Sequence, residues 1–214
     1  MDIFLDHVDE FGHSLLLTLA LTAIGFAGSL IIGTVTAVCR VSPVTPLRVV
    51  GAVYVEIFRN MPLLSLLIVV AFGLPDVGLR LSLFNSAAIC LMLIGGAFTC
   101  EALRSGINAV PEGNAEAARS IGLTFTQSIL FVVLPQALRS MIQPLVNIFI
   151  GQLLGSSLAA AVNVDELTYR VQFLNLQYAG GLALFGIAAV IYIVIALLSG
   201  AVGARLEKTL AVHR

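Results

Sequence analysis

Six polar side chains lie within or beside long apolar stretches of the sequence, where they could bind a polar solute. They are Glu56, Arg59, Asn147, Gln152, Ser156 and Ser157. Polar groups inside a membrane are expensive and are commonly functional, so we predict that these six line a substrate pathway. Two other interpretations stay open. Glu56 and Arg59, three residues apart, could pair with each other, and the four between 147 and 157 could bond to neighbouring helices.

The other reactive residue types show no arrangement that would support catalysis or metal binding. Histidine occurs only near the termini, at His7, His13 and His213, far from any candidate nucleophile. The three cysteines lie in apolar runs without metal-ligand spacing and are expected to be small buried hydrophobes. We therefore predict no catalytic residue, no metal site and no cofactor bound by this chain. A net charge of -1 and a single lysine argue against nucleic-acid binding.

The composition is that of a membrane protein. Hydrophobic residues make up 59% of the 214 residues and charged residues 11%, whereas about a quarter of a soluble protein is charged. Mean hydropathy is +1.04, and the acidic N-terminus does not resemble a secretory signal. We expect an all-α membrane protein with one domain, residues 1–214. Its five transmembrane helices are predicted at about 14–39, 50–75, 81–104, 137–162 and 178–204. Pro62 is expected to bend the second.

The distribution of basic residues predicts the orientation of these helices. Five spans would place most of the basic residues on one side: Arg40, Arg48, Arg104, Arg119, Arg139, Arg205, Lys208 and Arg214. Only Arg80 and Arg170 fall on the other side, which also receives the acidic residues of the N-terminus. Because cytoplasmic loops carry the excess of basic residues, we expect the N-terminus outside, the C-terminus inside and the loop of about residues 105–136 in the cytoplasm.

This cytoplasmic loop contains a polar, amphipathic stretch, residues 116–135, between two hydrophobic segments. Strong helix formers precede Gly122, which stands where a helix C-terminal glycine belongs. Thr124 and Gln127 then form a capping-box pattern that opens a second helix, and Pro135 predicts that this helix bends or ends before the fourth span. The result is a helix–turn–helix that either docks a partner or merely covers the membrane surface. We favour docking.

The spacing within this stretch resembles a known motif. Glu116-Ala117-Ala118, then Gly122, then Val132 and finally Leu134-Pro135 match the EAA motif of bacterial ABC importer permeases, with Val132 where isoleucine is usual. Residues 58–62, 101–107 and 134–139 resemble the branch that takes up polar amino acids, namely histidine, glutamine, glutamate and arginine. The similarity extends from about residue 10 to residue 205, which is nearly the whole chain.

The resemblance implies a type I ABC importer permease of the bacterial inner membrane. In that family the loop is a coupling helix that sits in a cleft of a cytoplasmic ABC ATPase dimer, and an extracellular or periplasmic binding protein delivers the substrate. Residues expected to contact the ATPase are Glu116, Ala117, Ala118, Arg119, Gly122, Leu134 and Pro135. The chain lacks a phosphate-binding G-x-x-x-x-G-K-[ST] loop, so ATP and magnesium would bind to the partner. Transport would proceed by alternating access, with glutamate or glutamine as the expected substrate.

Two substitutions bear on the second permease subunit of such an importer. Related subunits often carry a glutamate and a lysine where this sequence has Ile148 and Leu154. Either a different second permease supplies the charged contacts, or a homodimer leaves selection to the binding protein. We favour the heterodimer.

Two further functional classes remain as alternatives. One is a standalone secondary carrier or channel, against which the absence of internal repeats counts. The other is a membrane scaffold that recruits a soluble partner through the loop.

Overall fold

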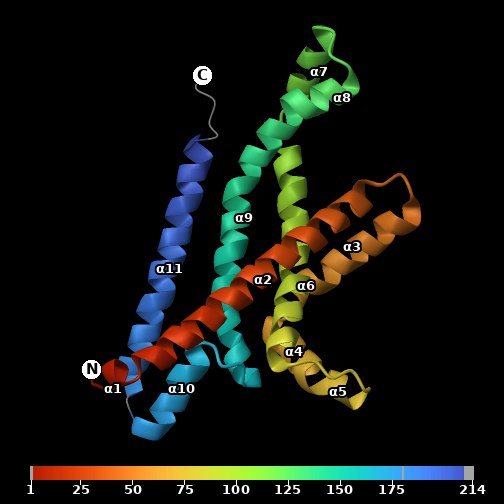
Figure 1. The fold of residues 1–214 in the computed structure, drawn as a ribbon. Coiled ribbons are helices and arrows are strands. Elements are labelled where there is room, and N and C mark those ends of the chain that lie inside the picture. The colour runs from red at the N-terminus through yellow and green to blue at the C-terminus, as the bar shows by residue number, and fades with distance from the viewer. Residues whose placement is uncertain (1, 180, 210–214) are drawn as a thin grey trace.

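The computed structural model describes residues 2–179 and 181–209, so His213 and Arg214 lie outside the described residues. These residues form helices and short connecting segments, without strands (Figure 1). The helices are α1 (Asp2–Asp6), α2 (Val8–Val41), α3 (Thr45–Asn60), α4 (Leu63–Ile68), α5 (Leu74–Asp76), α6 (Leu83–Asn108), α7 (Glu112–Ser120), α8 (Phe125–Ser128), α9 (Leu134–Ser156), α10 (Leu167–Tyr178) and α11 (Gly181–Thr209). Two π-helical turns, η1 (Val69–Gly73) and η2 (Ile129–Val133), and a 3-10 turn, η3 (Ser157–Val162), connect some of them.

Four helical segments are long and apolar enough to cross a membrane. They are Val8–Val41, Leu83–Asn108, Phe125–Val162 and Gly181–Thr209. A fifth span is obtained if Thr45–Asn60 and Leu63–Asp76 are counted together, although they meet at 102°. The all-α class is therefore confirmed, with four or five candidate spans.

The second span is broken rather than merely bent. The prediction for residues 50–75 was one helix bent at Pro62, but Met61 and Pro62 are both extended, with ψ angles of 129° and 128°. Proline has no N–H to donate to the preceding turn, and its ring disfavours helical conformation in the residue before it. Neither half alone reaches the length of about 20 residues that a bilayer requires.

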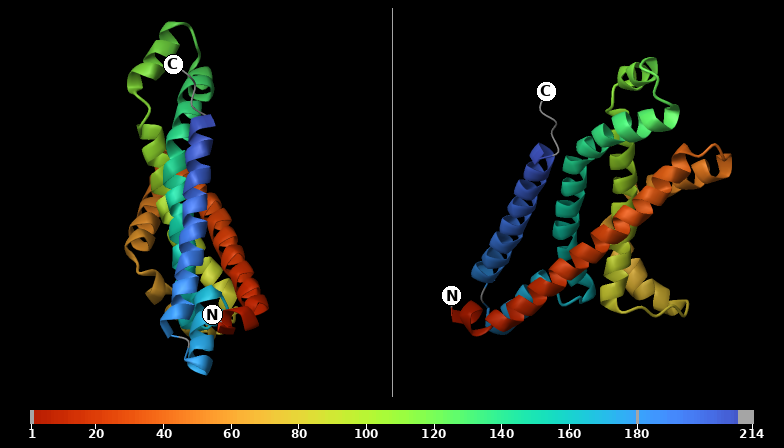
Figure 2. Two further views of the ribbon diagram at one scale, coloured as in Figure 1. Left: turned by 90° about the vertical axis from the view of Figure 1, so that its left-hand side faces the viewer. Right: turned by 45° about the horizontal axis from the view of Figure 1, so that its top comes forward.

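The helices form a bundle with two distinct ends. At one end lie α7, α8 and the C-terminal end of α11, and at the other lie α1, α5 and α10 (Figures 1 and 2). Helix α2 crosses the bundle obliquely (Figure 2). The start of α2 and the end of α11 are thus at opposite ends, as an odd number of spans requires.

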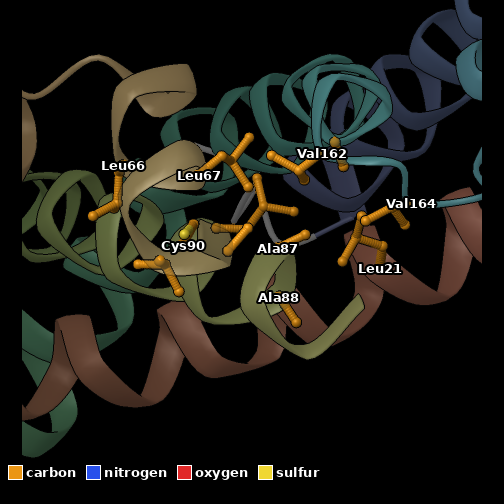
Figure 3. Close-up of a cluster of buried hydrophobic side chains, with 12 residues drawn as sticks. Leu21, Leu66, Leu67, Ala87, Ala88, Cys90, Val162 and Val164 are labelled. Carbon is orange, nitrogen blue, oxygen red and sulfur yellow. The ribbon is translucent and has the colours of Figure 1, made fainter. Parts of the chain in front are cut away.

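Glycines allow α2 and α6 to pack closely. A Cβ placed on Gly33 of α2 would lie 2.5 Å from Thr99 Cβ and 2.9 Å from the carbonyl oxygen of Gly96, both on α6. A hydrophobic cluster also joins α2, α4, α6 and η3, and includes Leu21, Leu67 and Val162 (Figure 3). The α2–α6 pair is therefore the framework against which the broken span and α9 are arranged.

A buried polar network holds together the end of the molecule that carries α10. Glu166 is fully buried and accepts hydrogen bonds from the backbone N–H groups of Thr168 (3.0 Å) and Tyr169 (2.8 Å), which caps α10. Its carboxylate also accepts a 2.7 Å hydrogen bond from the hydroxyl of Tyr192 on α11. The Arg170 guanidinium pairs with Glu10 of α2 at 2.9 Å, so the network connects three helices.

Both π-helical turns directly precede a Leu–Pro pair. Turn η1 is followed by Leu74-Pro75, and η2 by Leu134-Pro135. A proline inside a helix removes one N–H donor and clashes with the carbonyl four residues earlier, and a wider turn relieves both problems. Of the two outcomes expected at Pro135, the helix does not end there, since the segment Phe125–Val162 continues through it, and it changes direction between α8 and α9 (Figure 2).

Candidate functional site

The predicted docking segment projects from one end of the bundle. Helix α7, a four-residue turn and helix α8 fold back on each other there (Figure 1). We call this segment, residues 112–128, the elbow. Helix α6 leads into it through a short connection, and η2 and α9 lead out of it, so the elbow is fixed at both sides to helices that traverse the bundle.

Local hydrogen bonds determine the shape of the elbow. Gly122 has a φ of 92°, its N–H donates to Arg119 O (3.0 Å), and the N–H of Leu123 donates to Ala118 O (3.2 Å). These two bonds form a Schellman motif. Thr124 and Gln127 form the complete capping box that opens α8. Both local predictions, the glycine cap and the capping box, are confirmed.

The elbow exposes four of its five predicted contact residues and buries one. Glu116, Ala117, Arg119 and Gly122 are exposed. Ala118 is only 4% exposed, because α7 packs there against α8 and η2. Ala118, which was expected to contact the ATPase, is therefore covered, and a partner could reach only the surface that carries the other four. Leu134 and Pro135, at the base of the elbow, are exposed.

Two amides that sequence reasoning missed brace the elbow. The Asn114 amide donates a 2.7 Å hydrogen bond to Gln136 Oε1, and Gln136 Nε2 donates to Val132 O at 2.8 Å. Helix α7 is thereby connected to the first turn of α9. Their separation of 22 residues leaves no periodic signal that could have indicated the pair.

The helix that leads into the elbow carries an ion-pair cluster. Glu101 of α6 pairs with Arg40 at the end of α2, and Arg104 lies 3.6 Å from the same carboxylate oxygen. Arg40 and Glu101 are 61 residues apart in the sequence, so no helical spacing indicates this pair. This cluster connects the C-terminal end of α2 to α6 at a point seven residues before α6 ends.

A cavity of about 350 Å³ lies between α4, α6 and α9. Its walls are mainly apolar, with Leu63, Leu91 and Phe98 among them, and its polar lining comes from Asn147 and Gln152 of α9. Gln152 is 5% exposed, and its Nε2 donates a 2.6 Å hydrogen bond to Ser29 Oγ of α2. The Gln152 Oε1 atom is buried without a hydrogen-bond donor in the described part of the chain. The cavity thus offers a ligand the exposed amide of Asn147 and the unsatisfied acceptor Gln152 Oε1.

The other predicted pathway residues do not line this cavity. Ser156 and Ser157 each donate to a carbonyl of their own helix, at 2.7 Å and 2.6 Å. Glu56 and Arg59 are exposed on α3, and no ion pair joins them in the described residues. Instead, Glu56 Oε1 accepts a 3.2 Å hydrogen bond from the Asn60 amide. The structure therefore brings together two of the six predicted residues.

Comparisons with known proteins agree with this architecture. The family model of the binding-protein-dependent transport system inner membrane component matches residues 29–212. The probable glutamine ABC transporter permease protein GlnM of Bacillus subtilis is 40% identical over 174 residues, covering 81% of this chain and 79% of that protein. The glutamate transport system permease protein GluC of Corynebacterium glutamicum is 34% identical over 222 residues, covering 96% of this chain and 97% of that protein.

Solved structures resemble the fold over nearly its full length. A crystal structure of an amino acid ABC transporter with histidines has a TM-score of 0.91 at 28% identity and covers 96% of both chains. An inward-facing structure of the MetNI methionine ABC transporter has a TM-score of 0.70 at 23% identity, covers 96% of both chains and supports the fold alone.

Proposed function

The chain belongs to the family of binding-protein-dependent transport system inner membrane components, and we propose that it moves a polar amino acid into the bacterial cell as the transmembrane subunit of an ATP-driven ABC importer. The relatives described above are named as permeases for glutamine and glutamate, which makes these two the favoured substrates. The chain is a multi-pass membrane protein and not an enzyme, and the bacterial inner membrane is its proposed location. ATP and magnesium bind to the ATPase partner.

The elbow is the observation that carries this proposal. It extends beyond the helix ends (Figure 1) and exposes Glu116, Ala117 and Arg119. The Schellman motif, the capping box and the Asn114–Gln136 hydrogen bond make it rigid. A rigid projection transmits displacement, whereas a mobile loop would absorb it. We assign this face of the elbow to the cleft of a cytoplasmic ATPase dimer.

The connections of the elbow suggest how movement reaches the substrate. Helices α6 and α9, which enter and leave the elbow, both line the cavity that contains Asn147 and Gln152. A displacement of the elbow would change the distance between these helices and therefore the shape of the cavity. This is the behaviour that alternating access requires, and the two amides are our candidates for contact with the substrate.

We assign the second permease of the complex to a different chain. The cavity presents Ile148 where related subunits often carry a charged residue, so it offers amides but no charge to a zwitterionic amino acid. Together with a substrate-binding protein outside the cell, a partner permease would supply those charges. Purification of the tagged chain with its neighbours should recover a second type of permease, and recovery of this chain alone would exclude the heterodimer.

Uptake of labelled glutamine and glutamate tests the function. Cells that lack the chain should lose uptake of one of them, and the wild-type gene should restore it. Gly122→Val should reduce both uptake and ATPase association roughly tenfold, because a β-branched residue is strained at positive φ.

Gly78→Val provides a matched control, since Gly78 has a φ of 87° and no atoms near its would-be Cβ, but lies far from the elbow. It should leave ATPase association unchanged. Uptake that persists when the ATPase is absent would contradict the importer and favour a standalone carrier.

A further inference from the structure

Arg139, near the start of α9, has an unsatisfied hydrogen-bonding group. The four ion pairs in the described residues involve Arg40, Arg104 and Arg170, but not Arg139. Its Nε–H is buried and has no acceptor within the described part of the chain. A buried donor without an acceptor is unfavourable, and more so when the group is charged. This cost favours a ligand that brings an acceptor to the guanidinium.

Two cavities of different character meet at Arg139. One has a volume of about 300 Å³, and its polar lining includes Gln136, Ser140 and Glu207. The other has a volume of about 360 Å³ and is lined, apart from Arg139, by Leu130, Leu134, Pro135 and Leu138. The three leucines follow each other at four-residue intervals, so they form one apolar stripe along a helix. The arginine therefore stands between a polar and an apolar recess.

Most polar groups around the first cavity are already occupied. The Ser140 hydroxyl donates to Gly106 O at 2.9 Å, and the Gln136 amide donates to Val132 O at 2.8 Å. Glu207 Oε2 accepts a 2.9 Å hydrogen bond from Gln143 Nε2. Arg139 and Glu207 do not pair with each other among the described residues. The guanidinium and the second carboxylate oxygen of Glu207, which Gln143 does not contact, therefore remain available to the same cavity.

The position of Arg139 along the helices matches the boundary of a bilayer. Residues 140–162 of α9 and η3, and residues 181–204 of α11, contain no charged residue. Each stretch is close to the length that crosses the hydrocarbon core, about 20 residues. Arg139 and Glu207 stand just beyond these stretches, at the same end of the bundle as the elbow. Both charges therefore lie at the depth of lipid head groups.

From these observations we infer that Arg139 and Glu207 form a binding site for a phospholipid. The guanidinium binds the phosphate through two parallel N–H donors, a geometry for which arginine is suited. Glu207 accepts from an ammonium group such as that of phosphatidylethanolamine, and an acyl chain lies along Leu130, Leu134 and Leu138. Basic pockets between transmembrane helices bind lipid head groups in this way. A free phosphate ester would satisfy the charges but would leave the leucine stripe uncovered.

The inference rests on the proposed function only where it assigns the bound lipid to one leaflet of the membrane. If the elbow faces the cytoplasm, the bound lipid belongs to the inner leaflet and lies beside the first turn of α9, where Gln136 braces the elbow. Lipid binding itself requires no transport, so it can be measured even if the substrate or the ATPase is assigned wrongly.

Lipid retention by the purified complex tests the inference. Native mass spectrometry after detergent exchange should find a phospholipid bound to the wild-type complex, with phosphatidylethanolamine preferred over phosphatidylglycerol. Arg139→Gln should lower its occupancy roughly tenfold, the loss expected for one hydrogen bond to a charged group. Arg205→Gln is the matched control. Arg205 is an exposed arginine on α11, two residues before Glu207, and the Arg205→Gln variant should retain the lipid. Equal occupancy in Arg139→Gln and the wild type would overturn the inference.

Three further variants or ligands separate the components of the site. Glu207→Gln should keep the lipid but lose the preference for ethanolamine, and an unchanged preference would remove Glu207 from the site. If Arg139→Gln does not assemble, Arg139→Lys should assemble and retain less lipid than the wild type, and full retention would count against the guanidinium. Soluble phosphoethanolamine should displace the lipid far less well than a short-chain phosphatidylethanolamine. Equal displacement would indicate a free phosphate ester as ligand and overturn the lipid assignment.

Discussion

At the scale of single residues, the amide of Gln152 connects α9 with α2 in the interior of the bundle. Its Nε2 donates to Ser29 Oγ, which in turn donates to Gly25 O at 2.7 Å. Ser29→Ala would leave that amide N–H buried without an acceptor. We expect the free energy of unfolding to fall by about 1–3 kcal/mol, measured by denaturant unfolding of the purified complex.

Thr34→Ala is the control for this prediction. The Thr34 hydroxyl is exposed and donates only to a carbonyl of its own helix, Leu30 O. Its loss should change the unfolding free energy by less than about 0.5 kcal/mol. Equal effects of the two substitutions would mean that the Ser29–Gln152 hydrogen bond does not hold α9 against α2.

A second residue, Glu166, makes stability depend on pH. Burial raises the pKa of its carboxyl, and the hydrogen bonds from Thr168, Tyr192 and Tyr169 lower it only in part. Because the pKa is higher in the folded than in the unfolded state, the contribution of Glu166 to stability is complete below the ordinary glutamate range and is lost as the pH rises through the raised value. The melting temperature should therefore fall from acidic to neutral pH.

Glu166→Gln should flatten this dependence, whatever its effect on absolute stability. Asp76→Asn, at an exposed aspartate of α5, should leave the slope as it is in the wild type. A wild-type melting temperature that rises over the same range would contradict the assignment to Glu166.

Residue-level prediction from the sequence succeeded where the determining contacts are local. Gly122 and the Thr124–Gln127 box depend on neighbours within a few positions, and both were predictable. By contrast, the partner of Arg40 is Glu101, 61 residues away, and a helix pattern does not specify which neighbouring helix a side chain faces. For the same reason Asn147 and Gln152 could not be distinguished from Ser156 and Ser157 as cavity-lining residues.

At the scale of elements, the close approach of α2 and α6 depends on glycine. A Cβ on Gly33 would meet the Thr99 side chain and the backbone of Gly96, and a backbone atom cannot move aside locally. Gly33→Ala should therefore lower the unfolding free energy by about 1–3 kcal/mol, the usual cost of overpacking. Gly186→Ala on α11, whose Cβ would meet nothing within 4 Å, should be neutral. Thermal unfolding of both variants checks the prediction, and a neutral Gly33→Ala would show that the two helices can separate without cost.

The elements themselves were partly predictable. Hydropathy indicated the four continuous spans because each is apolar over its full length. It did not distinguish α10 as a separate helix, nor did it indicate that Pro62 produces an angle of 102°. That angle depends on what α3 and α4 pack against, which is a tertiary property.

At the scale of the whole molecule, the two ends of the bundle should face different compartments. Ser120 of α7 and Gln177 of α10 are exposed residues at opposite ends. With a membrane-impermeant thiol reagent, Gln177→Cys should be labelled in intact cells, and Ser120→Cys only after permeabilisation. The wild-type chain provides the background from its own cysteines. Labelling of Ser120→Cys in intact cells would reverse the orientation derived from the basic residues.

The break at Met61 and Pro62 also affects how the chain enters the membrane during synthesis. Helix α3 has 16 residues, which is shorter than the length of about 20 that crosses a bilayer, and it includes Glu56 and Arg59. It would therefore partition poorly from the translocon by itself. Its preceding turn is short, and Gly51 packs against Arg40 of α2. Helix α3 is therefore expected to enter the bilayer together with α2 as a helical hairpin. The strongly apolar α2 would supply the free energy of insertion that α3 lacks.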